Sequence, residues 1–228
     1  MLETVADDKG VHERRFALVV GKETGPGSLW MPSQPEGERP LVLLGHGGTR
    51  HKRYGYILHM ARRLVRHLGY AAAAIDAPRH GDRQRPGSQR PAVTAPISQV
   101  IAEWQATTDF VRSLPEVGSG PVGYWGLSMG CSLGISFVAA EPRIAAAVLG
   151  LSGRHEPLRQ AAAGVSCPVL FLLQWDDELV PRDHGLALFD AIGSPDKQLH
   201  ANPGRHQDVP MREFDAAERF FRERLVAG

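Results

Sequence analysis

The fold of this chain is decided by Gly126-Leu127-Ser128-Met129-Gly130, which follows the apolar run Pro121-Val122-Gly123-Tyr124-Trp125. The pattern predicts a buried strand, a sharp turn with Ser128 at its apex, and a helix. Such a turn strains the backbone of the apex residue, and glycine on either side lets the strand and the helix pass closely. Ser128 is therefore expected to present its hydroxyl at the carboxyl end of a sheet. The alternative is a glycine-bearing turn into a buried helix with no chemical role.

Length and composition are those of one ordinary globular domain. The chain has 228 residues, of which 43% are hydrophobic and 22% are charged, and its net charge is +1. One substantial core fits this length better than two small ones, so residues 1–228 are expected to form a single domain. The balanced charge argues against a nucleic-acid partner, and no apolar run is long enough to cross a membrane. The N-terminal stretch lacks the apolar core of a secretory signal, so we expect a cytoplasmic protein.

Predicted strands and helices alternate along the chain. Apolar runs predict strands at 16–20, 28–31, 41–44, 71–75, 121–125, 145–151, 169–173 and 198–201, with a turn at Gly25-Pro26-Gly27 between the first two. Apolar side chains at helical spacing predict helices at 57–68, 97–111, 129–141, 186–192 and 214–225. This alternation favours right-handed crossovers. The predicted fold is α/β: a doubly wound, mostly parallel sheet with helices on both faces.

A reactive Ser128 requires a base and an orienting carboxylate, because an unactivated hydroxyl is a poor nucleophile at neutral pH. In an open α/β sheet these groups lie just beyond the carboxyl ends of strands. His206 lies between the last short strand and the last helix, and this position distinguishes it among ten histidines. Asp177, after the strand that ends at Leu173, is the preferred carboxylate, and Asp176 is the alternative. A capped or solvated turn would also explain this acidic cluster.

A glycine-rich loop, Gly45-His46-Gly47-Gly48-Thr49, follows the strand predicted at 41–44. Its glycines leave backbone N–H groups free to face a ligand. We expect the N–H groups of Gly48 and Met129 to form an oxyanion hole beside Ser128. The imidazole of His46 is expected to point away from the chemistry and to fix the loop by hydrogen bonding. Tight packing alone would also account for the glycines.

These stretches, in this order, resemble the α/β-hydrolase superfamily over nearly the whole chain. The segment 126–130 is similar to the nucleophile elbow of that superfamily, and 46–48 is similar to its oxyanion loop. Asp76-Ala77-Pro78-Arg79-His80-Gly81-Asp82 is similar to its D-x-x-x-H-G loop. The resemblance implies that Asp177 is the acid and His206 the base of a catalytic triad. The acid motif usually opens with glycine, where this chain has Gln174.

The resemblance also points to a branch of the superfamily. Many relatives insert a helical cap between the strands that here end near Leu151 and begin near Val169, and this span is too short for one. The chain therefore resembles the capless carboxylesterases and the dienelactone-hydrolase-like branch. The usual dienelactone hydrolase nucleophile is cysteine, whereas Cys131 here is expected to be a packing residue. Cys131 and Cys167 have no metal or redox spacing. The expected triad chemistry needs neither a metal nor a cofactor, so none is expected.

Basic residues gather in two loops that follow neighbouring strands. The segment 79–90 holds four arginines, Arg83 and Arg85 among them, against a single acid, and three more basic residues lie at 50–53. Both segments leave the carboxyl edge of the sheet, so they are expected to form a positive rim over the site. Such a rim would favour substrates that bear a carboxylate or a phosphate. The alternative is a solvated loop that only keeps the surface soluble.

Two tryptophans adjoin the expected catalytic residues. Trp125 lies just before the nucleophile turn, and Trp175 lies just before the acidic cluster. We expect both to line a substrate pocket, and packing in the core is the alternative.

The leading hypothesis is a serine hydrolase that cleaves the carboxylic ester of a small molecule through an acyl-enzyme on Ser128. A peptidase, an amidase or an acyltransferase would use the same triad, because the difference lies in pocket shape and in the competition between water and other acceptors. A non-catalytic binding protein that keeps the fold is a further alternative. An intact triad argues against it, since a binding protein would tolerate the loss of one member.

Overall fold

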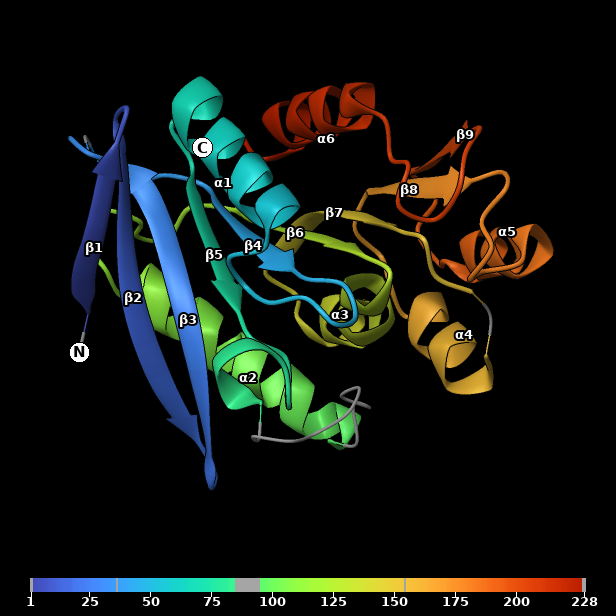
Figure 1. Ribbon diagram of the computed structural model, residues 1–228, viewed down its shortest axis with the longest axis horizontal. Coiled ribbons are helices and arrows are strands. Elements are labelled where there is room, and N and C mark those ends of the chain that lie inside the picture. The colour runs from blue at the N-terminus through green and yellow to red at the C-terminus, as the bar shows by residue number, and fades with distance from the viewer. Residues whose placement is uncertain (1, 36, 85–94, 154, 227–228) are drawn as a thin grey trace.

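A nine-stranded sheet forms the centre of the computed structural model, which describes residues 2–35, 37–84, 95–153 and 155–226 (Figure 1). The strands are Glu3–Asp8 (β1), Val11–Val20 (β2), Glu23–Pro32 (β3), Leu41–Gly45 (β4), Ala71–Ile75 (β5), Val122–Leu127 (β6), Ile144–Gly150 (β7), Val169–Gln174 (β8) and Lys197–Asn202 (β9). The α-helices are Gly55–Leu68 (α1), Ile97–Arg112 (α2), Met129–Ala140 (α3), Glu156–Ala163 (α4), Arg182–Ala191 (α5) and Met211–Arg224 (α6). A short 3₁₀ helix spans Gly81–Arg83 (η1).

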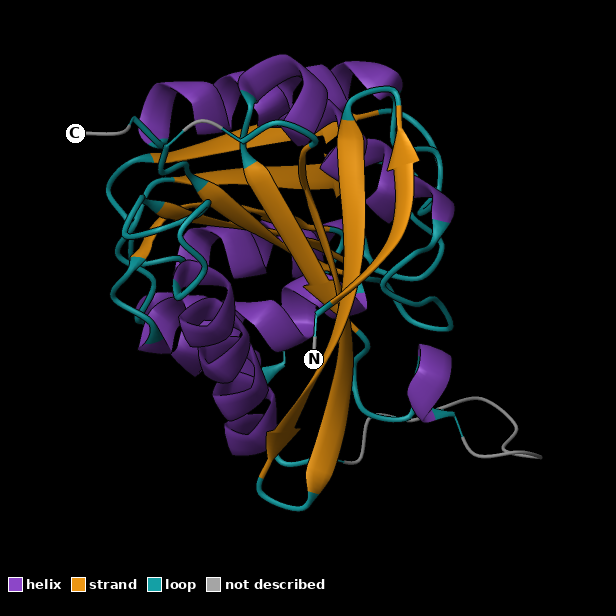
Figure 2. Ribbon diagram, turned by 90° about the vertical axis from the view of Figure 1, so that its left-hand side faces the viewer, coloured by secondary structure: helices purple, strands orange, loops and turns teal. Residues whose placement is uncertain are grey.

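The sheet has the order β1-β2-β3-β5-β4-β6-β7-β8-β9. From β5 to β9 neighbouring strands are parallel, whereas β1, β2 and β3 pair antiparallel and join this part through β3 and β5. Figure 2 shows the β2–β3 hairpin extending beyond the layers of helices. The predicted α/β fold with a mostly parallel sheet is confirmed.

Helices cover both faces of the sheet, as Figure 1 shows. On one face α1 and α6 pack over Val42, Leu44 and Trp125. On the other face the helices α2 to α5 pack over side chains such as Leu43 and Tyr124. Successive residues of β4 and β6 thus alternate between two cores, because strand side chains point to opposite faces with a period of two. Burial on both faces explains why these strands are apolar throughout.

Helix α1 ends where its sequence predicts. Gly69 caps it in the left-handed conformation, with φ 69°, and its N–H bonds back to Leu64 and Val65. A residue without a Cβ adopts this conformation with little strain, which explains the glycine at this position. The chain then enters β5 at Ala71, so four consecutive alanines form a strand despite their helical propensity. Tertiary pairing with β3 and β4 outweighs that local preference.

The turn predicted at Gly25-Pro26-Gly27 is wrong. The chain reverses earlier, between Val20 and Glu23, which are paired across the β2–β3 hairpin. Residues 25–27 instead continue β3, where Gly27 lies opposite Phe16. A Cβ atom on Gly27 would lie 2.1 Å from the ring of Phe16, so this glycine makes room for an aromatic side chain and is not a turn residue.

Strand β1, helix α4 and the short helix η1 were not among the predicted elements. Strand β1 is exposed at every position and carries three acids, so its sequence lacks the alternation that indicates a strand. Helix α4 occupies the described part of the span between β7 and β8, which holds no cap. Every helix within the described ranges is too short or too polar to cross a lipid bilayer.

Candidate active site

Ser128 occupies a strained turn between β6 and α3. Its φ is 57° and its ψ is −123°, a conformation that residues with a side chain rarely adopt. The strain persists because the surroundings fix it: the N–H of Ser128 donates to Gly150 O at 2.9 Å. A Cβ atom on Gly126 would lie 2.6 Å from Gly130 O, and one on Gly130 would lie 2.3 Å from Gly45 O. Both glycines are therefore required for the strand and the helix to pass.

The structure brings Ser128, His206 and Asp177 together at the carboxyl edge of the sheet. His206 Nε2 lies 2.9 Å from Ser128 Oγ, and His206 Nδ1 lies 2.7 Å from Asp177 Oδ2. The side chains of His206 and Asp177 are only 8% and 3% exposed. This arrangement allows the imidazole to accept the Ser128 proton while the carboxylate stabilises the charge that forms on the ring.

Backbone hydrogen bonds hold the carboxylate of Asp177 in this orientation. Its Oδ1 accepts the N–H groups of Leu179, at 2.8 Å, and Val180, at 2.9 Å, which leaves Oδ2 to face His206. Asp176 is exposed, and its Oδ2 accepts the N–H of Gly204 at 3.3 Å. Of the two acids that the sequence offered, Asp177 is the one that contacts the imidazole.

Two residues that were not predicted to have a role at the site, Glu178 and Gln174, connect the His206 loop to the acid loop. Glu178 accepts the backbone N–H of His206 at 3.0 Å, and this bond lowers the pKa of the Glu178 carboxyl. Gln174 donates its side-chain amide to the carbonyls of Arg205, at 3.2 Å, and Asp208, at 3.0 Å. A glycine in place of Gln174 could not make these bonds. The departure from the superfamily pattern thus has a structural role.

Hydrogen bonds hold both backbone polar groups of Gly47 in the glycine-rich loop. Gly47 O accepts a hydrogen bond from His46 Nδ1 at 2.9 Å, and the N–H of Gly47 donates to the hydroxyl of Tyr56 at 2.5 Å. Gly48 lines the same pocket as Ser128. The N–H of Met129 lies at the start of α3, where helical N–H groups have no acceptor within the helix. These two N–H groups are therefore the candidate oxyanion donors.

Two partners determine the protonation state of His46. A carbonyl oxygen can only accept, so Nδ1, which bonds Gly47 O, carries the proton. Nε2 then accepts the N–H of Ala77 at 3.0 Å, which requires a neutral ring. Burial is the main cause that lowers the pKa of His46 to about 4. The expected role of His46 in holding the loop agrees with these contacts.

We expect the His46 contacts to make the protein less stable in acid. The pKa of His46 is about 4 in the folded chain and 6.5 in an ordinary environment, so between these values only the unfolded state binds the proton. The free energy of unfolding should therefore fall by about 3 kcal/mol as the pH drops from 6.5 to 4, with no such dependence above this window. Urea unfolding of wild type and His46→Asn across this range measures the effect. Equal pH slopes for the two proteins would contradict it.

The loop after β5 is joined to the segment after the glycine-rich loop by a buried ion pair. Asp76 is fully buried and accepts the backbone N–H of Lys52 at 2.8 Å and its Nζ at 2.6 Å. Lys52 Nζ also bonds Asp82 at 2.7 Å and thereby lowers the pKa of that carboxyl. Gly81 packs on the carboxylate of Asp76, from which an added Cβ would be 2.3 Å away. The D-x-x-x-H-G loop thus supports the candidate oxyanion loop.

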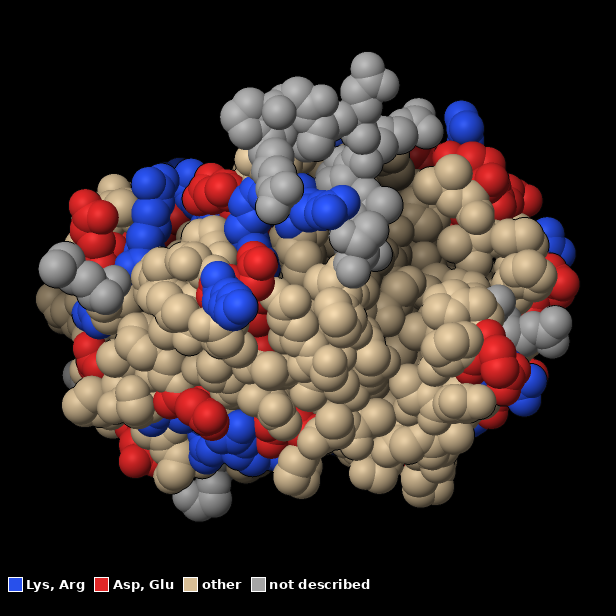
Figure 3. All heavy atoms as spheres, turned by 90° about the horizontal axis from the view of Figure 1, so that it is seen from below, with Lys and Arg blue, Asp and Glu red and all other residues tan. Residues whose placement is uncertain are grey.

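Three of the basic residues of the expected positive rim are paired with acids, whereas Arg50 lines the pocket at Ser128. The guanidinium of Arg83 is 7% exposed and makes two bonds to the carboxylate of Glu103, at 2.8 and 2.9 Å. Arg53 is paired in the same way with Glu13, and Lys52 with Asp76 and Asp82. Figure 3 shows Lys and Arg atoms interspersed with Asp and Glu atoms over the face seen from below. Arg83 does not line the pocket at Ser128, and Arg85 lies outside the described residues.

The two tryptophans have different surroundings. Trp125 is 1% exposed and lines the pocket at Ser128. Trp175 is 44% exposed, lies outside that pocket and carries the guanidinium of Arg182 over its ring at 3.8 Å. The expectation for Trp175 is therefore corrected: this side chain makes a surface contact with Arg182, because β8 ends before it and its ring turns outward.

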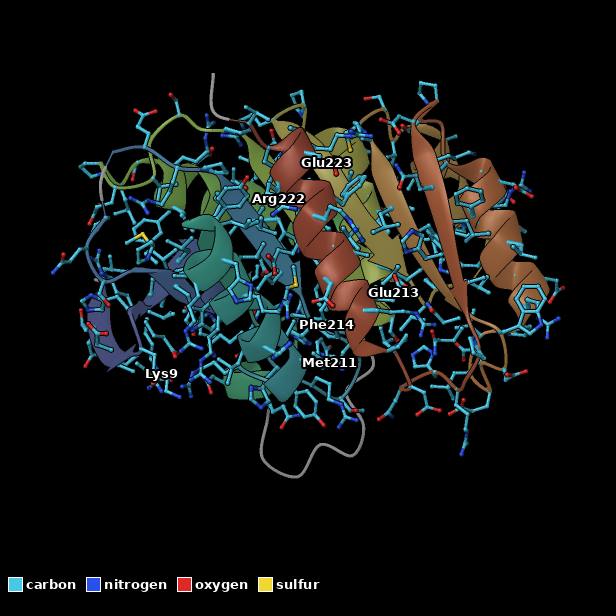
Figure 4. All side chains as sticks on the ribbon, turned by 90° about the horizontal axis from the view of Figure 1, so that it is seen from above. Lys9, Met211, Glu213, Phe214, Arg222 and Glu223 are labelled. Carbon is cyan, nitrogen blue, oxygen red and sulfur yellow. The ribbon has the colours of Figure 1, made fainter. Side chains whose placement is uncertain are left out.

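A cavity of about 670 Å³ opens beside Ser128 and His206. Its walls come from the glycine-rich loop, the start of α1, the end of β6 and the start of α6. Figure 4 shows Met211 and Phe214 at the start of α6, close to the start of α1. Both line the cavity, as do Tyr56 and Leu179. The cavity is large enough for a drug-sized molecule. These four residues were not predicted, because no sequence motif indicates that the starts of α1 and α6 and the turn after Asp177 meet at one cavity.

Cys131 is not suited to act as a nucleophile. The residue is fully buried, and burial raises the pKa of its thiol to about 12. Only the thiolate is strongly nucleophilic, so this thiol is inert at neutral pH. It packs in the core between α3 and the sheet, as expected.

Comparison with solved structures finds full-length similarity to an esterase. The chain is 41% identical to a cold-adapted esterase from an Arctic intertidal metagenomic library, seen in a PEG-bound complex, with a TM-score of 0.86 over 97% of both chains. It also resembles acetyl xylan esterase 1 from Thermoanaerobacterium, with 18% identity and a TM-score of 0.77 over 99% of this chain and 88% of that one. An identity of 18% is too low to indicate a shared function, so the similarity to acetyl xylan esterase 1 is evidence for a shared fold only.

Among curated proteins the similarities are partial. A putative phosphoribosyl transferase from Mycobacterium tuberculosis is 26% identical over 180 residues, which is 77% of this chain and 38% of that protein. An uncharacterised Escherichia coli protein is 34% identical over 68 residues, 30% of this chain and 22% of that protein. The chain thus spans well under two thirds of these relatives. A family model described as "Dienelactone hydrolase family" matches residues 41–204, which include Ser128 and Asp177. The chain belongs to the dienelactone hydrolase family.

Proposed function

We propose that the protein is a serine esterase that cleaves carboxylic esters of small molecules, with Ser128, His206 and Asp177 as its catalytic triad. The observation that carries the proposal is the hydrogen-bonded relay of 2.9 and 2.7 Å from Ser128 Oγ to Asp177. The full-length identity of 41% to an esterase supports the same reaction. Arg83, one of the arginines expected to attract anionic substrates, is paired with Glu103 and does not line the pocket.

In the first half of the reaction Ser128 Oγ attacks the ester carbonyl carbon while its proton passes to His206 Nε2. The carbonyl oxygen becomes an oxyanion, which accepts hydrogen bonds from the N–H groups of Gly48 and Met129. When the tetrahedral intermediate collapses, the bond to the alcohol oxygen breaks. The leaving alkoxide takes the proton from His206 Nε2, and the acyl group remains on Ser128.

In the second half a water molecule replaces the alcohol. Water attacks the acyl carbon and gives its proton to His206 Nε2, and the same N–H groups stabilise the second oxyanion. Collapse breaks the bond to Ser128 Oγ, which recovers its proton from His206. The carboxylic acid leaves, and the triad returns to its starting state. Asp177 remains ionised throughout and stabilises the imidazolium at each stage.

Covalent labelling tests this proposal. A fluorophosphonate probe should modify the protein at one site, which peptide mass spectrometry should locate at Ser128. The Cys131→Ser variant is the matched control and should label as the wild type does, because the Cys131 thiol is buried. An unlabelled protein would support a binding protein without catalysis, and labelling that requires Cys131 would overturn the choice of nucleophile.

A further inference from the structure

One wall of the cavity at Ser128 is a continuous row of aromatic rings. The centroids of Tyr54 and Tyr56 are 5.5 Å apart, those of Tyr56 and Trp125 are 5.8 Å apart, and those of Trp125 and Phe214 are 6.1 Å apart. The ring of His59 meets Phe214 at 5.1 Å. All five side chains line the cavity. We call these residues (Tyr54, Tyr56, Trp125, Phe214 and His59) the aromatic wall.

The aromatic wall is fixed relative to the reacting atoms. Trp125 belongs to β6, the strand that leads directly into Ser128. The hydroxyl of Tyr56 accepts the N–H of Gly47 in the candidate oxyanion loop at 2.5 Å. Phe214 is 8% exposed and packs on Trp125 from the first turn of α6. A group that contacts the wall is therefore held at a defined position relative to the carbonyl that Ser128 attacks.

The rest of the cavity has little charge to recognise. Among its described lining residues Arg50 is the one Lys, Arg, Asp or Glu, and its guanidinium already lies over the ring of Tyr54 at 4.4 Å. Leu127, Leu151 and Val209 add aliphatic surface, and the exposed side chains of Leu179 and Met211 extend that surface at the rim. A volume of about 670 Å³ is far more than an acetyl group needs.

We propose that the substrate is an ester that carries an aromatic ring and that this ring packs against the aromatic wall. The inference rests on the proposed esterase function and adds the chemical class of the substrate. Aromatic rings attract one another in offset and edge-to-face arrangements beyond the gain from buried area, by an amount that corresponds to about 2- to 12-fold in affinity. A planar ring should therefore be preferred over a saturated ring of similar size.

Two pairs of matched substrates test the proposal. The first is methyl 3-phenylpropanoate against methyl 3-cyclohexylpropanoate, with the ring on the acyl side. The second is 2-phenylethyl acetate against 2-cyclohexylethyl acetate, with the ring on the alcohol side. Hydrolysis is followed by proton release at constant pH, because a nitrophenyl leaving group would itself occupy the aromatic wall. We expect kcat/KM to favour the phenyl member by about 2- to 12-fold in at least one pair.

The cyclohexyl esters separate aromatic contacts from simple hydrophobic burial. Cyclohexyl compounds are more hydrophobic than their phenyl counterparts, so hydrophobic burial alone would favour the cyclohexyl member. A ratio of one or less in both pairs, with hydrolysis that still depends on Ser128, would overturn the aromatic substrate and leave the esterase function standing. Equal and negligible hydrolysis by wild type and Ser128→Ala would instead reject the proposed function.

Variants of the aromatic wall test whether it causes the preference for phenyl esters. Phe214→Leu should bring the phenyl-to-cyclohexyl ratio toward one, and Tyr54→Leu tests the other end of the wall if the first variant fails to fold. Phe189→Leu is the matched control, because Phe189 pairs with Phe171 on the opposite face of the sheet, outside the cavity, and should keep the wild-type ratio. The ratio is internal to each protein, so a general loss of activity does not affect it. An unchanged ratio in both wall variants would contradict the assignment.

Discussion

Replacing Ser128 by alanine is expected to lower kcat for ester hydrolysis by about 10⁶-fold, the scale found when a triad nucleophile is removed. The reason is that Ser128 Oγ is the atom that forms the acyl-enzyme, and His206 Nε2, 2.9 Å away, would have no hydroxyl to deprotonate. The residual rate would come from binding and from the oxyanion donors acting on water. Initial rates on a short-chain ester, with purified protein at high concentration, measure the loss.

The control for Ser128→Ala is a second serine, in the helix that follows Ser128. Ser132 is one turn further along α3, where its hydroxyl lies 2.7 Å from that of Ser152 and does not face the cavity. Ser132→Ala removes two partly buried hydrogen bonds, one to the hydroxyl of Ser152 and one to the backbone carbonyl of Ser128. It leaves the hydroxyl of Ser128 in place, so kcat should stay within about tenfold of wild type. Both variants should unfold at temperatures close to wild type. A Ser128→Ala protein that retains more than about 1% of kcat would reject Ser128 as the nucleophile.

Asp177→Asn is expected to lower kcat by about 10⁴-fold. The cause can be traced through individual atoms. The N–H groups of Leu179 and Val180 donate to Oδ1, so the oxygen of an asparagine would remain there and its NH₂ group would face His206. Nδ1 would then have to accept, and the proton would move to Nε2. In that tautomer the ring cannot take the proton of Ser128.

The neighbouring acids provide matched controls for this prediction. Asp176→Asn and Glu178→Gln remove one charge each within the same turn, yet neither carboxylate contacts the imidazole. Both should retain kcat within about tenfold, with Glu178→Gln the more affected because it weakens the bond to the His206 backbone. If Asp176→Asn lost more activity than Asp177→Asn, the assignment of the acid would have to be reversed.

The parallel part of the fold could be predicted because burial on both faces makes its strands apolar throughout. Leu41 to Leu44 alternate between two cores, and the helices α1 and α6 carry the apolar stripes that cover one of them. The sequence did not predict strands that form only because they pair with a neighbouring strand and that have no apolar pattern of their own. Strand β1 has no buried residue, and Gly25-Pro26-Gly27 contains typical turn residues that the sheet holds extended.

The site could be predicted to the extent that its residues occur at strand ends in a known order. Ser128, Asp177 and His206 each follow a strand of the parallel part of the sheet, and parallel strands place their carboxyl ends together. The position of a charged residue in the sequence does not reveal which side chain it pairs with. Arg83 and Glu103 are distant in the chain, so the bond that neutralises Arg83 became visible only in three dimensions. The aromatic wall depends likewise on α1, β6 and α6 meeting.

Strand β1 lies at the edge of the sheet, and no strand among residues 2–35, 37–84, 95–153 and 155–226 pairs with its outer side. An edge of this kind can template the addition of another chain. If two copies approached edge to edge in antiparallel fashion about the middle of β1, Glu3 of each would face Asp8 of the other, and Asp7 would lie nearby. Like charges directly opposite each other destabilise such a pairing. The acidic composition that conceals this strand in the sequence thus also disfavours the pairing of two β1 edges in this register.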